Sequence, residues 1–153
     1  MRNLAGRAAL VVNGGRGVGA EIALALAEAG AAVALLGRES CELTAVATMI
    51  RLQGRVVLGV TADFADPDDI AEAVETAREA LGPLTILIDP LGLPAAHDAV
   101  VPDMHAAGWG RAMTIVADES PILHDAPHGI RAVALSLEPH ATLLARIMEI
   151  IFT

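Results

Sequence analysis

The sequence VVNGGRGVGA (residues 11–20) decides how the rest of the chain is interpreted. Its four glycines follow AALVVN (residues 8–13), an apolar run with the length and composition of a buried strand. Glycines at a strand-to-helix turn let the backbone approach a phosphate, and the next helix offers free N–H groups to it. The stretch therefore predicts a strand, a tight turn and a helix. Two interpretations of the turn stay open: it holds a nucleotide, or it binds nothing.

Strand-like and helical stretches alternate along the first 90 residues. Asp66 is the predicted N-cap of one helix, Pro67 its first residue and Gly82 its end. Alternation of helices with continuous apolar strands is typical of a parallel sheet that is covered on both faces, a doubly wound α/β fold. The expected strands are residues 8–13, 31–37, 55–62 and 84–89, and the expected helices are residues 17–30, 40–54 and 66–82.

The second half of the chain has a less regular pattern. Residues 92–108 are rich in His, Asp and Pro and indicate a loop, whereas residues 109–119 look helical. Residues 129–137 indicate a strand, and residues 139–152 a last helix. We expect one domain over residues 1–153 with about five strands. Four of them take the order 3-2-1-4, and residues 130–136 form the fifth, beside the fourth.

Composition excludes several classes of protein. The chain of 153 residues has a net charge of −9 and 2% aromatic residues, which argues against a nucleic-acid partner. No apolar run is long enough to span a bilayer, and the one cysteine, Cys41, cannot form an internal disulfide. We therefore expect a soluble, cytoplasmic protein. All ten basic residues are arginines and there is no tyrosine, so this chain supplies neither an amine side chain nor a phenol.

Four segments together resemble the short-chain dehydrogenases/reductases, which are Rossmann-fold enzymes that use NAD(P)H. The segments are VNGGRGVG (12–19), ALLGR (34–38), TADFADPDDIAEAVETAREALGPLTILI (61–88) and APHGIRAVAL (126–135). The resemblance implies a Rossmann-like sheet and descent from oxidoreductases. It also implies a set of cofactor contacts: Asn13, Arg16, Gly17, Val18 and Gly19 in the glycine turn, Arg38, Asp63 and Phe64 near the adenosine, and Thr142 after the last strand.

The same resemblance implies that the cofactor is NADP(H). NAD-preferring members carry an acidic residue at the position of Gly37, and Arg38 follows it here. Arg16 is a second guanidinium in the glycine turn, and arginine suits a 2′-phosphate because it binds phosphate oxygens in pairs. Within the turn, Val12 replaces the family's threonine and Asn13 its first glycine; asparagine tolerates the positive φ that such a turn needs.

The departures from the family fall in the region of its catalytic residues. Asp89-Pro90-Leu91-Gly92 stands where the family has Asn-Asn-Ala-Gly, and the position of its catalytic asparagine falls on Val116. Only SPILHD (120–125) stands where the family has a strand with the catalytic serine and a Tyr-x-x-x-Lys helix; Ser120 is a candidate relic of that serine, but its neighbours do not match the family. The chain thus resembles a truncated member without the Ser/Tyr/Lys set. Arginine cannot replace the lysine, because it does not give up its proton.

Three functions follow as hypotheses. The first is an oxidoreductase by descent that retains NADP(H) and uses a substitute proton donor such as His97. The second is a non-redox enzyme (an isomerase, dehydratase or cyclase) in which Asp89, His97 and Asp98 act as acid and base beside the crevice. The third is a non-catalytic binding pseudoenzyme. For Asp89, His97 and Asp98 themselves, solvated loop residues are the alternative interpretation.

The remaining expectations concern metals and partners. The five histidines are His97, His105, His124, His128 and His140. Their spacing matches no ligand pattern that we know, and Pro127 prevents His124 and His128 from sharing a helix face, so we predict no metal site. We expect a small-molecule ligand. We also expect a homodimer, formed through apolar surface near residues 104–118 and the tail IMEIIF (147–152).

Overall fold

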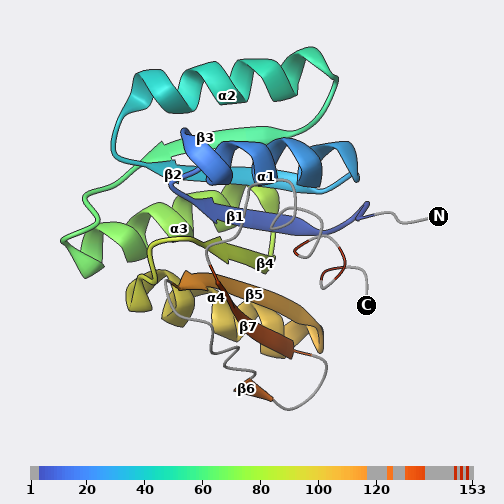
Figure 1. Cartoon of the computed structure of the whole chain (residues 1–153), viewed down its shortest axis with the longest axis vertical. Coiled ribbons are helices and arrows are strands. Elements are labelled where there is room, and N and C mark those ends of the chain that lie inside the picture. Colours follow the sequence, from blue (N-terminus) through green and yellow to red (C-terminus); the bar gives the residue numbers. More distant parts are fainter. Residues whose placement is uncertain are drawn as a thin grey trace.

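The computed structural model describes residues 4–116, 124–125 and 130–136, together with residues 147, 149 and 151. Its strands form one sheet in the order β3-β2-β1-β4-β5-β7-β6 (Figure 1). All neighbouring strands are parallel except β6 and β7. The strands are β1 (Ala8–Val12), β2 (Ala32–Gly37), β3 (Val57–Thr61), β4 (Leu84–Asp89), β5 (Gly110–Val116), β6 (His124–Asp125) and β7 (Ile130–Ser136).

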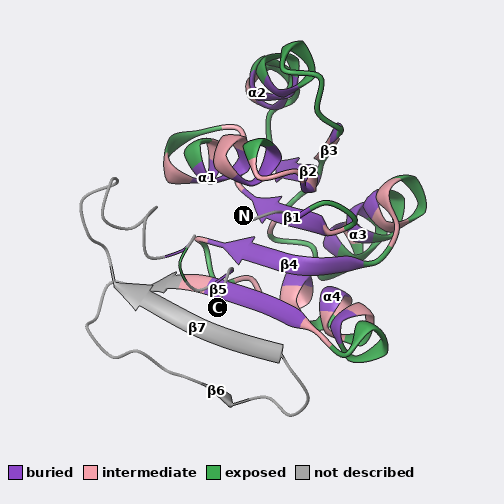
Figure 2. Ribbon diagram, turned by 90° about the vertical axis from the view of Figure 1, so that its right-hand side faces the viewer, coloured by how far each residue is buried: buried purple, intermediate pink, exposed green. Residues whose placement is uncertain are grey.

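Helices cover both faces of this sheet, as Figures 1 and 2 show. The side chains of β1 alternate between two cores: Val11 packs with the buried faces of α1 and α2, and Leu10 packs with those of α3 and α4. A doubly wound, Rossmann-like α/β fold is thereby confirmed. The helices are α1 (Gly17–Glu28), α2 (Ser40–Leu52), α3 (Pro67–Leu81) and α4 (Pro94–Ala107).

The first 90 residues fold as their pattern predicts. The four expected strands form in the order 3-2-1-4, with the three expected helices between them. The Asp66 carboxylate caps α3 by accepting the Asp68 N–H at 3.0 Å, and Gly82 follows the helix with φ 86°. Residues 130–136 also form the expected strand, β7.

The expected loop over residues 92–108 is wrong, because residues 94–107 form α4. Ala96, Val100 and Met104 are spaced four residues apart and are completely buried, which gives this helix its core-facing stripe. Pro94 occupies the first turn, where its missing N–H costs nothing, and Gly108 ends the helix in the left-handed conformation. Burial of the stripe outweighs the break expected from Pro102, which lies inside the helix.

The expected helix over residues 109–119 is also wrong, because residues 110–116 form β5. This strand pairs with β4 on one side and with β7 on the other, so β7 does not lie beside β4 as expected, and the sheet exceeds five strands. Gly110 allows the strand to pass close to α4: a Cβ there would lie 2.5 Å from the sulfur of Met104.

The last helix expected, over residues 139–152, lies largely outside the described residues. Ile147, Glu149 and Ile151 are helical, and both isoleucines are buried in the core beside α1 and α2. Val116 ends β5, and Ser120, His128, His140 and Thr142 fall outside the described residues. Among the helices that the structure describes, none has the length and apolar character needed to cross a membrane.

Candidate nucleotide-binding site

The glycine turn joins the end of β1 to the start of α1. Asn13 takes φ 59° and Gly17 takes φ 57°, both left-handed, so the turn depends on residues that tolerate this conformation. The N–H of Gly14 donates to the carbonyl oxygen of Leu36 at 3.2 Å and ties the turn to the end of β2. The substitution of asparagine for a glycine at position 13 is therefore compatible with the turn.

Two other glycines permit close packing around this turn. A Cβ on Gly19 would lie 2.5 Å from the carbonyl oxygen of Asn13, and a Cβ on Gly15 would lie 3.0 Å from the Cβ of Glu42 in α2. The first distance is too short for any side chain, because the neighbouring atom belongs to the backbone. These glycines bring the start of α1 against the end of β1 and leave the backbone of the turn accessible.

The N-terminus of α1 has no internal cap. Its N-cap residue, Arg16, makes no side-chain capping bond, and the first turn contains no acidic residue. The N–H groups of Gly17, Val18 and Gly19 thus have no helical partner, and they lie at the positive end of the helix dipole. Helix α3, on the other face of the sheet, differs, since Asp66 caps it and two further aspartates occupy its first turn. Of the two helix starts, that of α1 suits an anion.

Arg16 points toward α2. Its guanidinium makes a salt bridge to Glu42 at 3.0 Å, and the side chain of Arg16 is 63% exposed. An exposed pair of this kind contributes at most about 1 kcal/mol, so a phosphate can compete with the glutamate for the arginine.

Arg38 and Phe64 meet at the carboxyl edge of the sheet. Arg38 follows β2 and Phe64 follows β3, and the guanidinium lies 5.3 Å from the centroid of the ring. Asp63 shapes the loop that carries Phe64: its N–H donates to the Asp69 carboxylate at 2.6 Å, and its own carboxylate accepts the Ala65 N–H at 3.0 Å. The residues expected at the adenosine thus come from neighbouring strands, on the side of the sheet where α/β proteins bind ligands.

Asp89, a candidate acid or base, is engaged with its own loop. It ends β4, is 2% exposed, and accepts the N–H groups of Leu91 at 3.2 Å and Leu93 at 2.6 Å, one on each carboxylate oxygen. Burial raises the pKa of Asp89 above its ordinary value, while the loop N–H groups and the charge of His97 lower it in part. This carboxylate anchors the loop between β4 and α4.

His97 and Asp98 lie at the start of α4; Asp98 is exposed and His97 is partly buried. Their side chains approach to 3.9 Å between Nδ1 and Oδ1, and they are 45% and 84% exposed. That distance is too long for a hydrogen bond. Because the charge of His97 acts on the pKa of Asp89, the structure brings these two candidates near one another, but it does not join all three into a hydrogen-bonded set.

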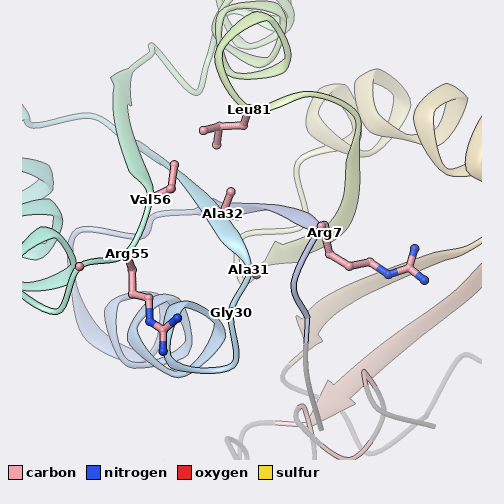
Figure 3. A pocket seen from close by; sticks show the side chains of 9 residues that line it. Arg7, Gly30, Ala31, Ala32, Arg55, Val56 and Leu81 are labelled. Atoms are coloured by element: carbon pink, nitrogen blue, oxygen red, sulfur yellow. The ribbon is translucent and has the colours of Figure 1, made fainter.

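A cavity of about 300 Å³ lies at the opposite end of the sheet from the glycine turn (Figure 3). Gly6, Ala32 and Val56, at the amino ends of β1, β2 and β3, contribute to its lining. Arg7, which also lines it, points away from Arg55 in Figure 3 and stacks on Trp109 at 3.6 Å from the ring centroid. The guanidinium of Arg111 lies 4.4 Å from the same ring. Sequence patterns could not reveal this arrangement, since no local spacing links residue 7 to residue 109.

The described residues contain no group of three or more His, Cys, Asp or Glu side chains placed to hold a metal ion. The backbone of His124 belongs to β6. His105 lies in the last turn of α4, on the exposed side of the helix.

Comparison with known proteins identifies the family. The model of the short chain dehydrogenase family matches residues 7–117. An uncharacterised oxidoreductase of Mycobacterium tuberculosis is 45% identical over 92 residues, which are 60% of this chain and 35% of that protein. Galactitol 2-dehydrogenase (L-tagatose-forming) of Cereibacter sphaeroides is 34% identical over 115 residues, which are 75% of this chain and 43% of that enzyme. The chain thus spans less than half the length of these two relatives.

Solved structures share the fold. The 3-oxoacyl (acyl-carrier-protein) reductase of Agrobacterium tumefaciens with NADP bound is 29% identical, with a TM-score of 0.67 over 75% of this chain and 54% of that one. L-Sorbose reductase of Gluconobacter frateurii, complexed with NADPH and L-sorbose, is 24% identical, with a TM-score of 0.70 over 76% and 54% of the two chains. The glycine turn, the sheet order and the family match agree, and this chain belongs to the short-chain dehydrogenase family.

Proposed function

We propose that this chain binds NADP(H) through the adenosine and pyrophosphate half of the cofactor. One observation carries the proposal: the glycine turn keeps its left-handed residues and its close packing, and the N-terminus of α1 has no internal cap. The family to which the chain belongs uses nicotinamide cofactors. In this proposal the N–H groups of Gly17, Val18 and Gly19 donate to the pyrophosphate.

The preference for NADP(H) over NAD(H) rests on charge at the end of β2. Gly37 is neutral and Arg38 follows it, exposed and near the ring of Phe64. We assign the 2′-phosphate to Arg38, with Arg16 as a second cation once it leaves Glu42. Asp63 and Phe64 flank the adenine. The similar reductase of Agrobacterium tumefaciens, which has NADP bound, supports this choice.

We propose that the chain is an oxidoreductase by descent that does not use the family's usual hydride-transfer residues. A bound nicotinamide would supply or accept the hydride, but this chain has neither a tyrosine nor a lysine to move the accompanying proton. Both carboxylate oxygens of Asp89 accept N–H groups of the loop before α4. This engagement disfavours the hypothesis of a non-redox enzyme in which Asp89 acts as acid or base. His97, whose side chain is 45% exposed, remains the candidate substitute proton donor.

A pair of titrations tests the cofactor. NADPH and NADH are titrated separately into the full chain, and binding is followed by the fluorescence of the nicotinamide. We expect NADPH to bind about tenfold more tightly than NADH, a difference of about 1.4 kcal/mol, and Arg38→Ala to abolish the preference. Arg51→Ala removes the same charge from the far end of α2 and should leave the preference intact. Absence of NADPH binding at a concentration of about 1 mM, a dissociation free energy near 4 kcal/mol, would overturn the proposal.

A second assay tests the chemistry. The complex with NADPH is incubated with a panel of ketones and aldehydes, and oxidation of the cofactor is followed at its absorption band. We expect little or no oxidation above the rate without protein. Rapid oxidation that His97→Ala slows would favour instead the hypothesis of a reductase with a substitute proton donor.

Further proposals concern partners and location. We propose that the partner is a small-molecule ligand and not a nucleic acid, because the net charge of the chain is −9. We also propose a cytoplasmic location on the basis of the same composition. We also propose a homodimer, although the reason differs from the one expected from sequence. Met104, Met113, Ile147 and Ile151 are buried within the chain itself, so these apolar side chains do not need a partner to cover them.

A further inference from the structure

Strand β3 forms one edge of the sheet. Among the strands that the structure describes, β2 is its one partner, and Figure 2 shows β3 at the border of the sheet between α2 and α3. The pairing with β2 runs from Val57 to Thr61 without a change of register, so no bulge turns this edge away from a neighbour.

The pairing with β2 determines which backbone groups face outward. The carbonyl oxygen of Val56 accepts from Val33 at 3.1 Å, and the N–H of Ala62 donates to the carbonyl oxygen of Gly37 at 3.0 Å. In a parallel ladder, residues that bond to one neighbour alternate with residues that face the other side. The groups that face the open edge are therefore the N–H and carbonyl groups of Val57, Gly59 and Thr61.

This edge lacks the usual protection against pairing. Native edge strands commonly carry a charge, a proline or a bulge, or they are covered by another element. β3 has the sequence VLGVT, with neither a charge nor a proline, and Gly59 and Thr61 are exposed. Val56, just before the strand, is 59% exposed. Such an edge is a template for another strand.

Opposite charges flank the two ends of β3. Arg55 precedes the strand and Asp63 follows it, and both are exposed. Each lies four residues from Gly59, which is the central residue of the strand. In an antiparallel pair related by a two-fold axis, each end of a strand lies beside the other end of its copy. The edge is thus complementary to itself in charge.

We propose that β3 pairs with β3 of a second copy of this chain in an antiparallel arrangement centred on Gly59. Gly59 then faces the partner's Gly59, and Val57 faces the partner's Thr61, so the outward backbone groups of both strands meet in hydrogen-bonded pairs. Arg55 faces the partner's Asp63. The two sheets become one continuous sheet across the two-fold axis.

Helix α2 leaves room for this pairing. A groove of about 260 Å³ lies between α2 and β3, lined by Ser40, Leu43, Thr44, Ala47 and Arg51 on the helix and by Gly59 and Thr61 on the strand. The volume of this groove leaves space on this face beside the partner's strand. On the other face, Leu58 lies opposite the partner's Val60, and both are half-buried in the isolated chain, so pairing covers further apolar area.

This inference rests on the proposed homodimer and not on nucleotide binding, which the titration with NADPH tests separately. Sedimentation of the full chain between about 1 and 100 μM should show a monomer–dimer equilibrium, a range that covers dissociation free energies of about 5 to 8 kcal/mol. A monomer throughout that range would overturn both the homodimer and this surface. Species larger than a dimer would overturn the closed two-fold arrangement.

Exchange of charges tests the surface itself. Arg55→Asp and Asp63→Arg each place like charges across the axis, and each should raise the dissociation constant roughly tenfold. The double variant Arg55→Asp/Asp63→Arg restores the pairs and should restore the dimer, which a merely damaged loop would not do. Glu28→Arg, a reversal on α1, serves as the control. A dimer unaffected by either single variant would place the interface elsewhere.

Amide hydrogen exchange gives an independent measurement on the unaltered chain. Dimer formation should slow exchange at Gly59 and Thr61, whose N–H groups face the edge. Exchange at Leu58 and Val60 should be slow in monomer and dimer alike, because β2 already accepts their N–H groups. If each of the four amides exchanged at the same rate at low and at high protein concentration, the pairing would be contradicted.

Discussion

Asn13 and Gly19 approach so closely that a Cβ on Gly19 would lie 2.5 Å from the carbonyl oxygen of Asn13. This close approach holds the start of α1 against the end of β1. The N–H groups of the first turn of α1, which have no helical partner, therefore lie at the carboxyl edge of the sheet. The same turn contains Gly17, where φ is 57° but a Cβ would have no neighbouring atom within 4 Å. The two glycines are therefore needed for different reasons.

Substitution of each glycine by alanine should separate these reasons. Gly19→Ala should lower the free energy of unfolding by about 1–3 kcal/mol and abolish NADPH binding, because the backbone must move to admit the methyl group. Gly17→Ala should cost about 1 kcal/mol for its left-handed backbone and retain most of the binding. Urea unfolding and the NADPH titration measure both effects. Equal loss of binding in the two variants would argue against a steric role for Gly19.

The salt bridge from Arg16 to Glu42 should limit NADPH affinity. Glu42→Gln frees the guanidinium and removes a negative charge beside the glycine turn, so NADPH should bind several-fold more tightly, while stability changes by less than about 1 kcal/mol. The increase should disappear in Arg16→Ala/Glu42→Gln and should shrink at high salt. An unchanged affinity in Glu42→Gln would mean that Arg16 does not reach the cofactor.

Asp89 should matter for the stability of the loop before α4. Asp89→Ala leaves the N–H groups of Leu91 and Leu93 without their acceptor and should cost about 2 kcal/mol of unfolding free energy. Asp89→Asn retains one acceptor oxygen and should cost less. Urea unfolding at neutral pH measures both variants. If Asp89→Ala were as stable as the wild type, the loop would not depend on this carboxylate.

The pH dependence of the Asp89 contribution has a definite sign. Burial raises the folded-state pKa of Asp89 above its ordinary value of 3.8, so folding favours the protonated carboxyl. Its contribution to stability is fully present below the ordinary pKa and is lost as pH rises through the folded-state pKa. The stability of the wild type relative to Asp89→Asn should therefore be greatest in acid and should fall toward neutral pH. Unfolding measured from pH 3 to pH 7 would show the opposite trend if the pKa were lowered.

Asp103 should be a main stabiliser of the packing between α3 and α4. Its carboxylate accepts from Arg78 Nε at 2.9 Å and from the N–H of Leu84 at 2.9 Å, and its side chain is 13% exposed. The same pairing raises the pKa of Arg78. Asp103→Ala should lower the free energy of unfolding by about 2–3 kcal/mol, because it leaves the half-buried guanidinium of Arg78 and the N–H of Leu84 without this acceptor. Glu75→Gln, which alters the more exposed partner of Arg78, should cost less than about 1 kcal/mol in the same urea assay.

The sequence alone was enough to predict where the residues in the nucleotide half of the candidate site lie. Asn13, Gly17 and Gly19 fall where the glycine spacing indicates, and Arg38 follows β2 as the strand pattern requires. These features are local, since a turn and the residue after a strand are specified by their immediate neighbours. The roles of Asp89 and Arg16 depend instead on hydrogen bonds and charges from other segments. Proton transfer by Asp89 and phosphate binding by Arg16 stay predictions; the structure adds the contacts of Asp89 with its loop and of Arg16 with Glu42, which no local pattern specifies.

By itself the sequence determined the first three strand–helix units and β4, the order 3-2-1-4, the glycine turn and the family. Periodicity, caps and turn residues act over a few positions, and right-handed connections then leave few possible arrangements. Only the tertiary structure decided that residues 94–107 are a helix containing Pro102 and that residues 110–116 are a strand. Both depend on packing between elements that are distant in the sequence, since Met104 is buried in one core with Leu10 of β1 and β5 gains its hydrogen bonds from β4 and β7. The free energy of those contacts outweighs the local preference for helix, strand or loop, and it cannot be inferred from any short stretch of the sequence.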